Sequence, residues 1–314
     1  MIDIRLLTMR PVRIAAFALV VALSTFSSIA QNPAPPAAPE PPPYQWPRSH
    51  NYDVQSYRIA LSFDWTKQSI AGENTITFQP FGDDVKEIEI DAGDMTINSV
   101  KLASGAPLKF RYEGKEKLYV ALDQLYPAGR YVSVVISYAA TPKQGLTFIT
   151  PSEGDPGRPF QIWSQGESRT NHYWFPCYDS PNDKATSELL ATVDDKFQVV
   201  SNGALIGVQR DAAHKTKTWH WKMDRQFSSY LISIIVGQYE EVKDQFKGKP
   251  VTSYVYPGQT EDGRVSFSKL AQMVGFYSQK TGYDYPYAKY AQTMVRDFGG
   301  AGIPAYWLTV KAKQ

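Results

Sequence analysis

The sequence predicts a mainly β protein: an antiparallel β-sandwich or saddle-shaped domain, followed by a shorter segment that contains a helix. From residue 51 onward, apolar residues alternate with polar ones in short runs, and turn-forming residues interrupt these runs about every eight to twelve positions. Alternation buries one face of each strand, and regularly spaced turns are typical of antiparallel β domains. Near Thr260 the apolar residues change from a period of two to the spacing of a helix.

Residues 1–30 have the features of an export signal. Arg10 and Arg13 precede an unbroken apolar run over Ile14–Leu23, and small residues lead up to Ala30. Because this run is too short to cross about 30 Å of hydrocarbon, an uncleaved anchor is the weaker alternative. We therefore expect cleavage near Ala30, an exported (periplasmic or extracellular) protein and no lasting membrane anchor.

Residues 31–50 are predicted to be a proline-rich linker. Eight of the seventeen residues in 31–47 are proline, which removes backbone donors and favours an extended, solvated chain. We expect this segment to act as a spacer.

The predicted β domain covers residues 51–240. Tyr57, Ile59 and Leu61 alternate with polar residues, so one face of this strand should lie in a core. Ile70, Ile76 and Phe78 repeat the pattern, and Gly72 is expected at a bend or bulge. Further strands are expected at Ile88–Ile90, Leu108–Tyr112, Leu118–Leu122, Val132–Tyr138, Leu189–Val193, Lys217–Met223 and Tyr230–Val236.

Residues 241–314 are predicted to begin a different domain, with one amphipathic helix of about twenty residues that starts near Thr260. Gly282 and Pro286 mark the expected end of this helix. The apolar residues at helical spacing are Val265, Leu270, Met273, Val274 and Tyr277. Because only about 55 residues follow Thr260, too few for a stable domain, this stripe should be exposed unless it packs on the β domain.

Charge and cysteine content exclude several classes of function. The chain has 33 basic and 31 acidic residues, and without residues 1–30 it is formally neutral. A neutral chain has no broad basic face, so we expect no nucleic-acid partner. The one cysteine, Cys177, excludes an internal disulfide and a cysteine-cluster metal site, and only four histidines are available as other ligands.

The densest group of polar residues lies in residues 162–181. This stretch combines an acid, an amide, an arginine and a histidine with many aromatic residues. Such residues on a connection between strands are typical of a binding site on a rigid scaffold. An ordinary salt-bridged loop is the alternative.

Five motifs in order resemble those of the aminopeptidase N family of zinc metallopeptidases. The residues that carry the resemblance are Gln165–Glu167, Phe175–Pro181 with Lys184–Thr186, Val200–Gly203, Ser229–Leu231 with Val236–Gly237, and Tyr285–Tyr287 with Lys289–Tyr290. Their order and approximate spacing agree with the family over about residues 51–300. Each motif is weak alone, but five in order are specific.

The resemblance implies an N-terminal β domain that covers a thermolysin-like zinc domain. In the family, side chains of the Q-x-E motif bind the free α-amine of a peptide substrate, and this role falls on Gln165 and Glu167. A partly desolvated carboxylate suits the task, because it makes charge-assisted hydrogen bonds to an ammonium group. The alternative for Glu167 is an ion pair with Arg169 or Lys184.

The sequence departs from the family near its C-terminal end. Residues 296–302 and 303–307 stand where the family has G-x-M-E-N and its continuation, no H-E-x-x-H follows, and the sequence ends at Gln314. No catalytic residue and no metal ligand of the family can therefore be placed. Residues 241–314 are interpreted as the truncated start of the zinc domain, an incomplete α+β thermolysin-like segment with an aberrant tail. A frameshift near the codons for Gly300 to Gly302 is one hypothesis for this tail.

The sequence thus predicts a fragment of an exported zinc-dependent aminopeptidase. The parent enzyme would use zinc to remove N-terminal residues from peptides, and its partners would be peptide N-termini. The family implies a metallo-aminopeptidase, whereas the missing H-E-x-x-H argues that this chain binds no zinc and is inactive alone. The rival interpretation is a non-catalytic β-sandwich that binds a peptide or a protein.

Overall fold

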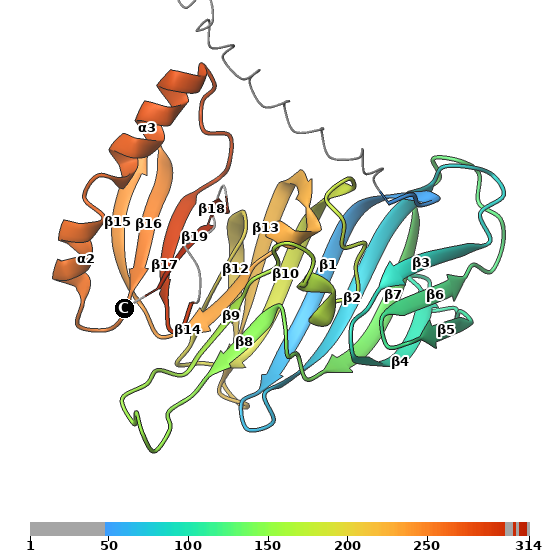
Figure 1. Ribbon diagram of the computed structural model, residues 1–314, viewed down its shortest axis with the longest axis horizontal. Coiled ribbons are helices and arrows are strands. Elements are labelled where there is room, and N and C mark those ends of the chain that lie inside the picture. Colours follow the sequence, from blue (N-terminus) through green and yellow to red (C-terminus); the bar gives the residue numbers. More distant parts are fainter. Residues whose placement is uncertain (1–47, 299–303, 306–307, 313–314) are drawn as a thin grey trace, which may run out of the picture. The chain divides into compact units, whose positions relative to one another are not determined.

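The computed structural model describes residues 48–298 together with the strand residues 304–305 and 308–312. The predicted export signal, nearly all of the predicted linker and residues 299–303 of the predicted tail lie outside the described residues. Figure 1 shows the described elements with their labels.

A seven-stranded sheet forms the base of the β domain. In spatial order its strands are β12 (Ala204–Asp211), β13 (Thr216–Ser228), β10 (Lys184–Asp194), β1 (Tyr52–Asp64), β2 (Ser69–Pro80), β7 (Val132–Ala140) and β4 (Met95–Leu102). Tyr57, Ile59 and Leu61 of β1 are buried, as their alternation predicts. All pairs in this sheet are antiparallel except β1 with β10, which run parallel.

Gly72 lies in a regular stretch of β2 and not at the bend or bulge that was expected. It pairs with Leu61 on one side and with Tyr138 on the other, without a shift of register. A Cβ atom at this position would lie 2.4 Å from Cζ of Tyr138. The glycine therefore makes room for a tyrosine ring that crosses the sheet face.

Two smaller antiparallel sheets complete the β domain. One has the order β11 (Gln198–Ser201), β14 (Ile234–Gly237), β9 (Gln161–Ser164) and β8 (Leu146–Ile149). The other has the order β3 (Glu87–Asp91), β6 (Lys117–Ala121) and β5 (Phe110–Glu113). The predicted mainly β class with antiparallel sheets is confirmed.

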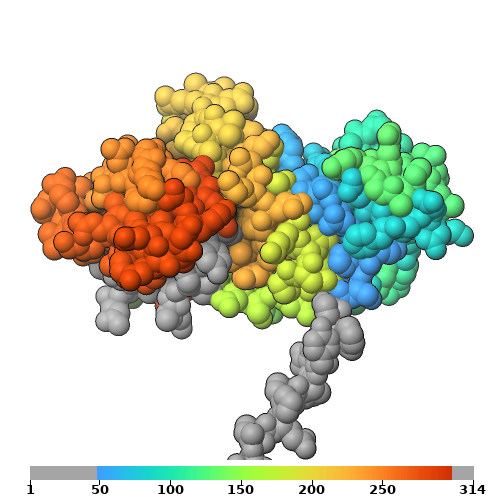
Figure 2. Space-filling view, turned by 90° about the horizontal axis from the view of Figure 1, so that it is seen from above, coloured from blue at the N-terminus to red at the C-terminus, as the bar shows by residue number. Residues whose placement is uncertain are grey.

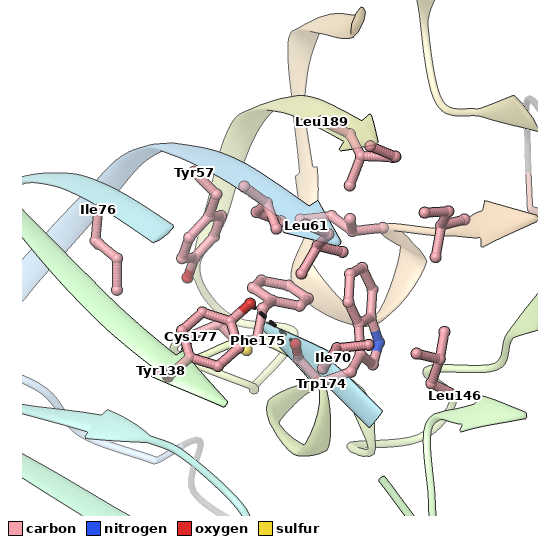
Figure 3. Close-up of a cluster of buried hydrophobic side chains, with 14 of the residues drawn as sticks. Tyr57, Leu61, Ile70, Ile76, Tyr138, Leu146, Trp174, Phe175, Cys177 and Leu189 are labelled. Atoms are coloured by element: carbon pink, nitrogen blue, oxygen red, sulfur yellow. Dashed lines mark hydrogen bonds between the residues drawn. The ribbon is translucent and has the colours of Figure 1, made fainter. Parts of the chain in front are cut away.

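The hydrophobic core draws side chains from these sheets and from the loop after β9. Trp174, Phe175 and Cys177 of this loop are completely buried, and they lie among residues of β1, β2, β7 and β8 (Figure 3). The hydroxyl of Tyr138 donates a hydrogen bond to the carbonyl oxygen of Trp174 (3.0 Å). Burial of several large side chains gives this loop a fixed position, since each contributes about 1.5–3 kcal/mol.

A mixed sheet follows the β domain. Its order is β15 (Glu240–Phe246), β16 (Lys249–Val255), β17 (Tyr290–Val295), β19 (Leu308–Ala312) and β18 (Pro304–Ala305), and β17 runs parallel to both β16 and β19. Between β14 and β15 the chain passes from the four-stranded sheet to the mixed sheet, close to the predicted boundary at residue 240. In the space-filling view this segment, orange to red, lies beside yellow residues of the β domain (Figure 2). The boundary itself stays a prediction.

The single helix expected after Thr260 is interrupted. The structure has α2 (Thr260–Ser266) and α3 (Leu270–Thr281), separated by three non-helical residues. The hydroxyl of Ser268 donates to the carbonyl oxygen of Val265, which competes with helical backbone bonding. Helix α3 ends at Gly282 in the left-handed conformation, as predicted.

Helix α3 packs through only part of its apolar stripe. Leu270 and Val274 are buried, whereas Met273 and Tyr277 are more than half exposed. All four residues line an apolar groove of about 730 Å³ between α3 and the turn that leads to β17. No helix among the described residues is long and apolar enough to cross a membrane.

Candidate functional site

The polar segment singled out in the sequence connects two sheets. It begins at the end of β9 in the four-stranded sheet and leads through the short 3₁₀-helix η1 (Asn171–Tyr173) to β10 in the seven-stranded sheet. The loop of residues 165–183, called the site loop below, is therefore fixed at both ends.

Gln165 and Glu167 lie at the start of the site loop. Gln165 is half-buried, and Glu167 is exposed. The backbone N–H of Gln165 donates to the carbonyl oxygen of Gly145 (2.8 Å), and its carbonyl oxygen accepts a hydrogen bond from the hydroxyl of Thr170 (2.6 Å). Within the described part of the chain, neither side chain has a hydrogen bond or an ion pair.

The alternative that Glu167 is a salt-bridge partner has no support in the geometry. Arg169 instead donates from Nε to the carbonyl oxygen of Asp179 (3.1 Å). Lys184 lies exposed at the start of β10. Because Glu167 is exposed, it also differs from the partly desolvated carboxylate that the sequence led us to expect.

Asp179 holds the middle of the site loop. This completely buried carboxylate accepts hydrogen bonds from the backbone N–H of His172 (3.2 Å) and from the hydroxyl of Ser229 (3.1 Å), and it lies 2.8 Å from Nδ1 of His172. The three groups are not arranged as a catalytic triad, because the serine hydroxyl donates to the carboxylate and not to the imidazole.

Asp91, the last residue of β3 in the three-stranded sheet, anchors the site loop. One of its carboxylate oxygens accepts the backbone N–H of Asp179 (2.9 Å) and a hydrogen bond from Arg48. The other accepts a hydrogen bond from Lys117 (2.6 Å). Burial opposes ionisation of Asp91, but the hydrogen bond from Lys117 and the charge of Arg48 outweigh it, so the pKa of Asp91 lies below its ordinary value.

Cys177 is not arranged as a nucleophile. It is completely buried, and its backbone pairs with Asp91 of β3. Burial and the nearby charge of Asp179 raise the pKa of its thiol well above the ordinary value, which keeps it protonated. The cysteine fills space in the core.

The histidines of the chain do not fit a zinc site. All four lie among the described residues, and each is paired with a carboxylate in a different place: His50 with Asp183, His172 with Asp179, His214 with Asp211 and His220 with Glu188. Within residues 48–298, no three His, Cys, Asp or Glu side chains are grouped as metal ligands. Zinc chemistry therefore has no ligand set in this part of the molecule.

Strand β9 connects the site loop to the mixed sheet. Gln161 donates from Nε2 to the carbonyl oxygen of Met294 (3.0 Å) and accepts from the N–H of Arg296 (2.8 Å). Trp163 donates from Nε1 to the carbonyl oxygen of Arg296 (3.0 Å). Strand β9, which ends one residue before Gln165, thus also holds the end of β17.

The family model of the peptidase M1 N-terminal domain matches residues 51–231. The chain belongs to the peptidase M1 family. The match covers every strand of the β domain except β14, and the whole site loop, so the predicted resemblance is confirmed.

Relatives of the M1 chain include proteins named as aminopeptidases and proteins named as transcription factor subunits. The probable aminopeptidase 1 of Sulfurisphaera tokodaii is 25% identical over 256 residues, which are 81% of this chain and 30% of that protein. The transcription initiation factor TFIID subunit 2 of Gallus gallus is 29% identical over 167 residues, 52% of this chain and 14% of that protein. The chain thus spans less than a third of the length of either relative.

A solved M1 structure shares the fold. The M1 zinc metallopeptidase E323A mutant of Deinococcus radiodurans, bound to a Tyr-Ser-Ala substrate, superimposes with a TM-score of 0.67. The similarity covers 82% of this chain and 60% of that chain at 20% sequence identity. The fold of the M1 N-terminal region is therefore present here, together with part of the segment that follows it.

Sequence reasoning missed the buried carboxylate and the two partly buried cations that hold the site loop. Asp91, Arg48 and Lys117 come from segments far apart in the chain, and no local spacing marks them. Asn171 was noticed only as part of a polar stretch, although it is completely buried. Its position just before a run of aromatic residues was the one signal available.

Proposed function

We propose that this chain contributes the amine-binding side of an M1 aminopeptidase site, with Glu167 as the charged partner of the substrate α-ammonium and Gln165 as a neighbouring polar contact. The observation that carries the proposal is the carboxylate of Glu167, which has no partner in residues 48–298 although its loop is fixed on both sides. An exposed carboxylate without a partner, carried on a fixed loop, suits recognition of a ligand cation.

The remaining parts of the proposal concern the parent enzyme. Its zinc would be held by residues that this chain does not supply, since the histidines here are dispersed. We therefore propose that the chain by itself does not hydrolyse peptides, and that it is exported with cleavage near Ala30. N-terminal sequencing of the protein recovered from the exported fraction tests the cleavage, and an intact residue 1 would refute it.

The proposal is tested by binding of a free-amine peptide to the full chain. The tripeptide Tyr-Ser-Ala and its N-acetylated form are titrated in parallel, and backbone amide shifts of the site loop are followed by NMR. We expect saturable shifts with the free amine alone. Equal shifts with both peptides, or shifts with neither, would refute amine recognition.

Glu167→Gln is the variant that isolates the charge. Because Glu167 is exposed, its pairing with an ammonium is worth at most about 1 kcal/mol, so we expect about a fivefold loss of affinity. Glu153→Gln, which removes an exposed carboxylate from another loop, is the control and should bind as wild type. Loss of affinity in both variants would indicate a general effect of net charge.

A non-catalytic binding module is the second candidate. It is favoured by the similarity to a protein that is named as a transcription factor subunit and not as a peptidase. Such a module predicts binding that does not depend on a free amine. The paired titration with Tyr-Ser-Ala and its N-acetylated form therefore separates the two candidates, since only amine recognition distinguishes the two peptides.

A further inference from the structure

Gly166 lies between the two proposed amine contacts and is confined on two sides. A Cβ atom at this position would lie 2.2 Å from the carbonyl oxygen of Tyr230 and 2.5 Å from Oδ1 of Asn171. Neither distance can be reached by real atoms, so no side chain fits between Gln165 and Glu167. The backbone here is shaped by contact with Asn171 and with the segment around Tyr230.

The amide of Asn171 is held at all of its polar positions. Nδ2 donates to the carbonyl oxygens of Ser229 (2.7 Å) and Ile232 (2.9 Å), and Oδ1 accepts the indole N–H of Trp174 (2.8 Å). The side chain is completely buried. Because both donors and the acceptor are used, the amide cannot rotate without breaking a buried hydrogen bond.

The base of the turn next to Asn171 is closed by Thr170. The backbone N–H of Thr170 donates to the carbonyl oxygen of Gly166 (3.0 Å), and the hydroxyl of Thr170 donates to the carbonyl oxygen of Gln165 (2.6 Å). Glu167 and Ser168 therefore form the exposed tip of a turn whose base is buried. No interaction of the Glu167 side chain with described residues holds it, so the backbone at the base of the turn decides the point from which the side chain projects.

We propose that Asn171 is a positioning residue for amine recognition: it fixes the backbone at Gly166 and thereby the direction of Gln165 and Glu167. This inference rests on the proposed function of those two residues. Asn171 itself touches no ligand. It acts by joining three segments, namely the end of β9, η1 and the turn after β13.

Two variants test this role from opposite sides of the same contact. Asn171→Ala removes the amide, and Gly166→Ala introduces a methyl group against it. Gly154→Ala is the control for the glycine change, because nothing lies within 4 Å of a Cβ there. Val255→Ala, a truncation in the buried core of the mixed sheet, is the control for lost stability.

The affinity of the folded protein for Tyr-Ser-Ala is measured by NMR well below the melting temperature. A merely structural role of Asn171 would lower the melting temperature, as Val255→Ala does, and would leave this affinity unchanged. We expect Asn171→Ala and Gly166→Ala to weaken binding about fivefold, and both controls to bind as wild type. Wild-type affinity in folded Asn171→Ala would overturn the proposal. If Asn171→Ala does not fold, Gly166→Ala decides.

The amide signals of Gly166 and Glu167 without peptide separate this inference from the proposed function. If wild type shows no preference for the free amine, amine recognition fails. The positioning of Glu167 by Asn171 still predicts that its amide shift moves in Asn171→Ala and not in Val255→Ala. An unchanged shift would overturn the positioning itself.

Discussion

Lys289 gives the most quantitative prediction, because its ammonium group is buried where the mixed sheet meets the β domain. The side chain is 7% exposed, and Nζ donates to the carbonyl oxygen of Ser201 (2.6 Å). It also lies 4.6 Å from the centre of the Trp221 ring. Burial lowers the pKa of Lys289 from 10.5 to about 7.

The lowered pKa determines how stability changes with pH. Between about pH 7 and 10.5 the unfolded chain binds more protons at this lysine than the folded chain, so this group makes stability rise with pH. The slope is about 1.4 kcal/mol for each pH unit, or roughly 2–3 kcal/mol between about pH 7.5 and 9.5. Below about pH 7 both states are protonated, and the contribution no longer changes.

Lys289→Met keeps an unbranched side chain that is one atom shorter, and it removes the titrating group. The free energy of unfolding in urea is measured for wild type and variant at several pH values in this range. We expect the variant to lose the rise, so that its stability relative to wild type falls by roughly 2–3 kcal/mol as the pH increases.

Lys249→Met is the matched control. Lys249 is half-buried, and its ammonium group also donates to a backbone carbonyl, that of Tyr285. This variant should keep the wild-type slope. A stability difference between wild type and Lys289→Met that does not depend on pH would refute the burial argument.

Three further predictions concern the β domain. Asp91→Asn should cost about 1–3 kcal/mol in urea unfolding at neutral pH, because the partly buried cations Arg48 and Lys117 lose this buried carboxylate and, among the described residues, keep only Glu89 as an ionic partner. Since the folded pKa of Asp91 lies below 3.8, this difference should persist down to about pH 4 and shrink below it, and a constant difference would contradict the assignment. Gly72→Ala should cost about 1–3 kcal/mol in thermal unfolding through its clash with Tyr138, whereas an unchanged melting temperature would show that the ring can move. Cys177 should react with a thiol reagent only in denaturant, and rapid labelling of the native protein would show that the core opens.

The strands could be predicted from the sequence because their signal is local. Alternation at Tyr57, Ile59 and Leu61 directly reports a half-buried strand. The break in the predicted helix was missed because Ser268 is compatible with a helix until its hydroxyl takes the carbonyl of Val265. The role of Gly72 was missed because it depends on Tyr138, a residue from another strand.

The site could be predicted only in part. Gln165 and Glu167 were found through a family motif. That Arg169 does not pair with Glu167 could not be known from the sequence, because it depends on the contact of Arg169 with Asp179. Asn171 and Asp91 act through contacts with residues from distant segments. Long-range contacts of this kind leave no spacing pattern in a single sequence.

The carboxyl carbon of Glu167 is the atom whose behaviour tests amine recognition most directly. Its chemical shift in the labelled full-length chain is followed by NMR during addition of Tyr-Ser-Ala or of the N-acetylated peptide. If Glu167 receives the substrate ammonium, its carboxyl signal moves and saturates with the free-amine peptide and stays in place with the acetylated one. A signal that stays in place with both peptides, while other amides of the site loop shift, would contradict the assignment.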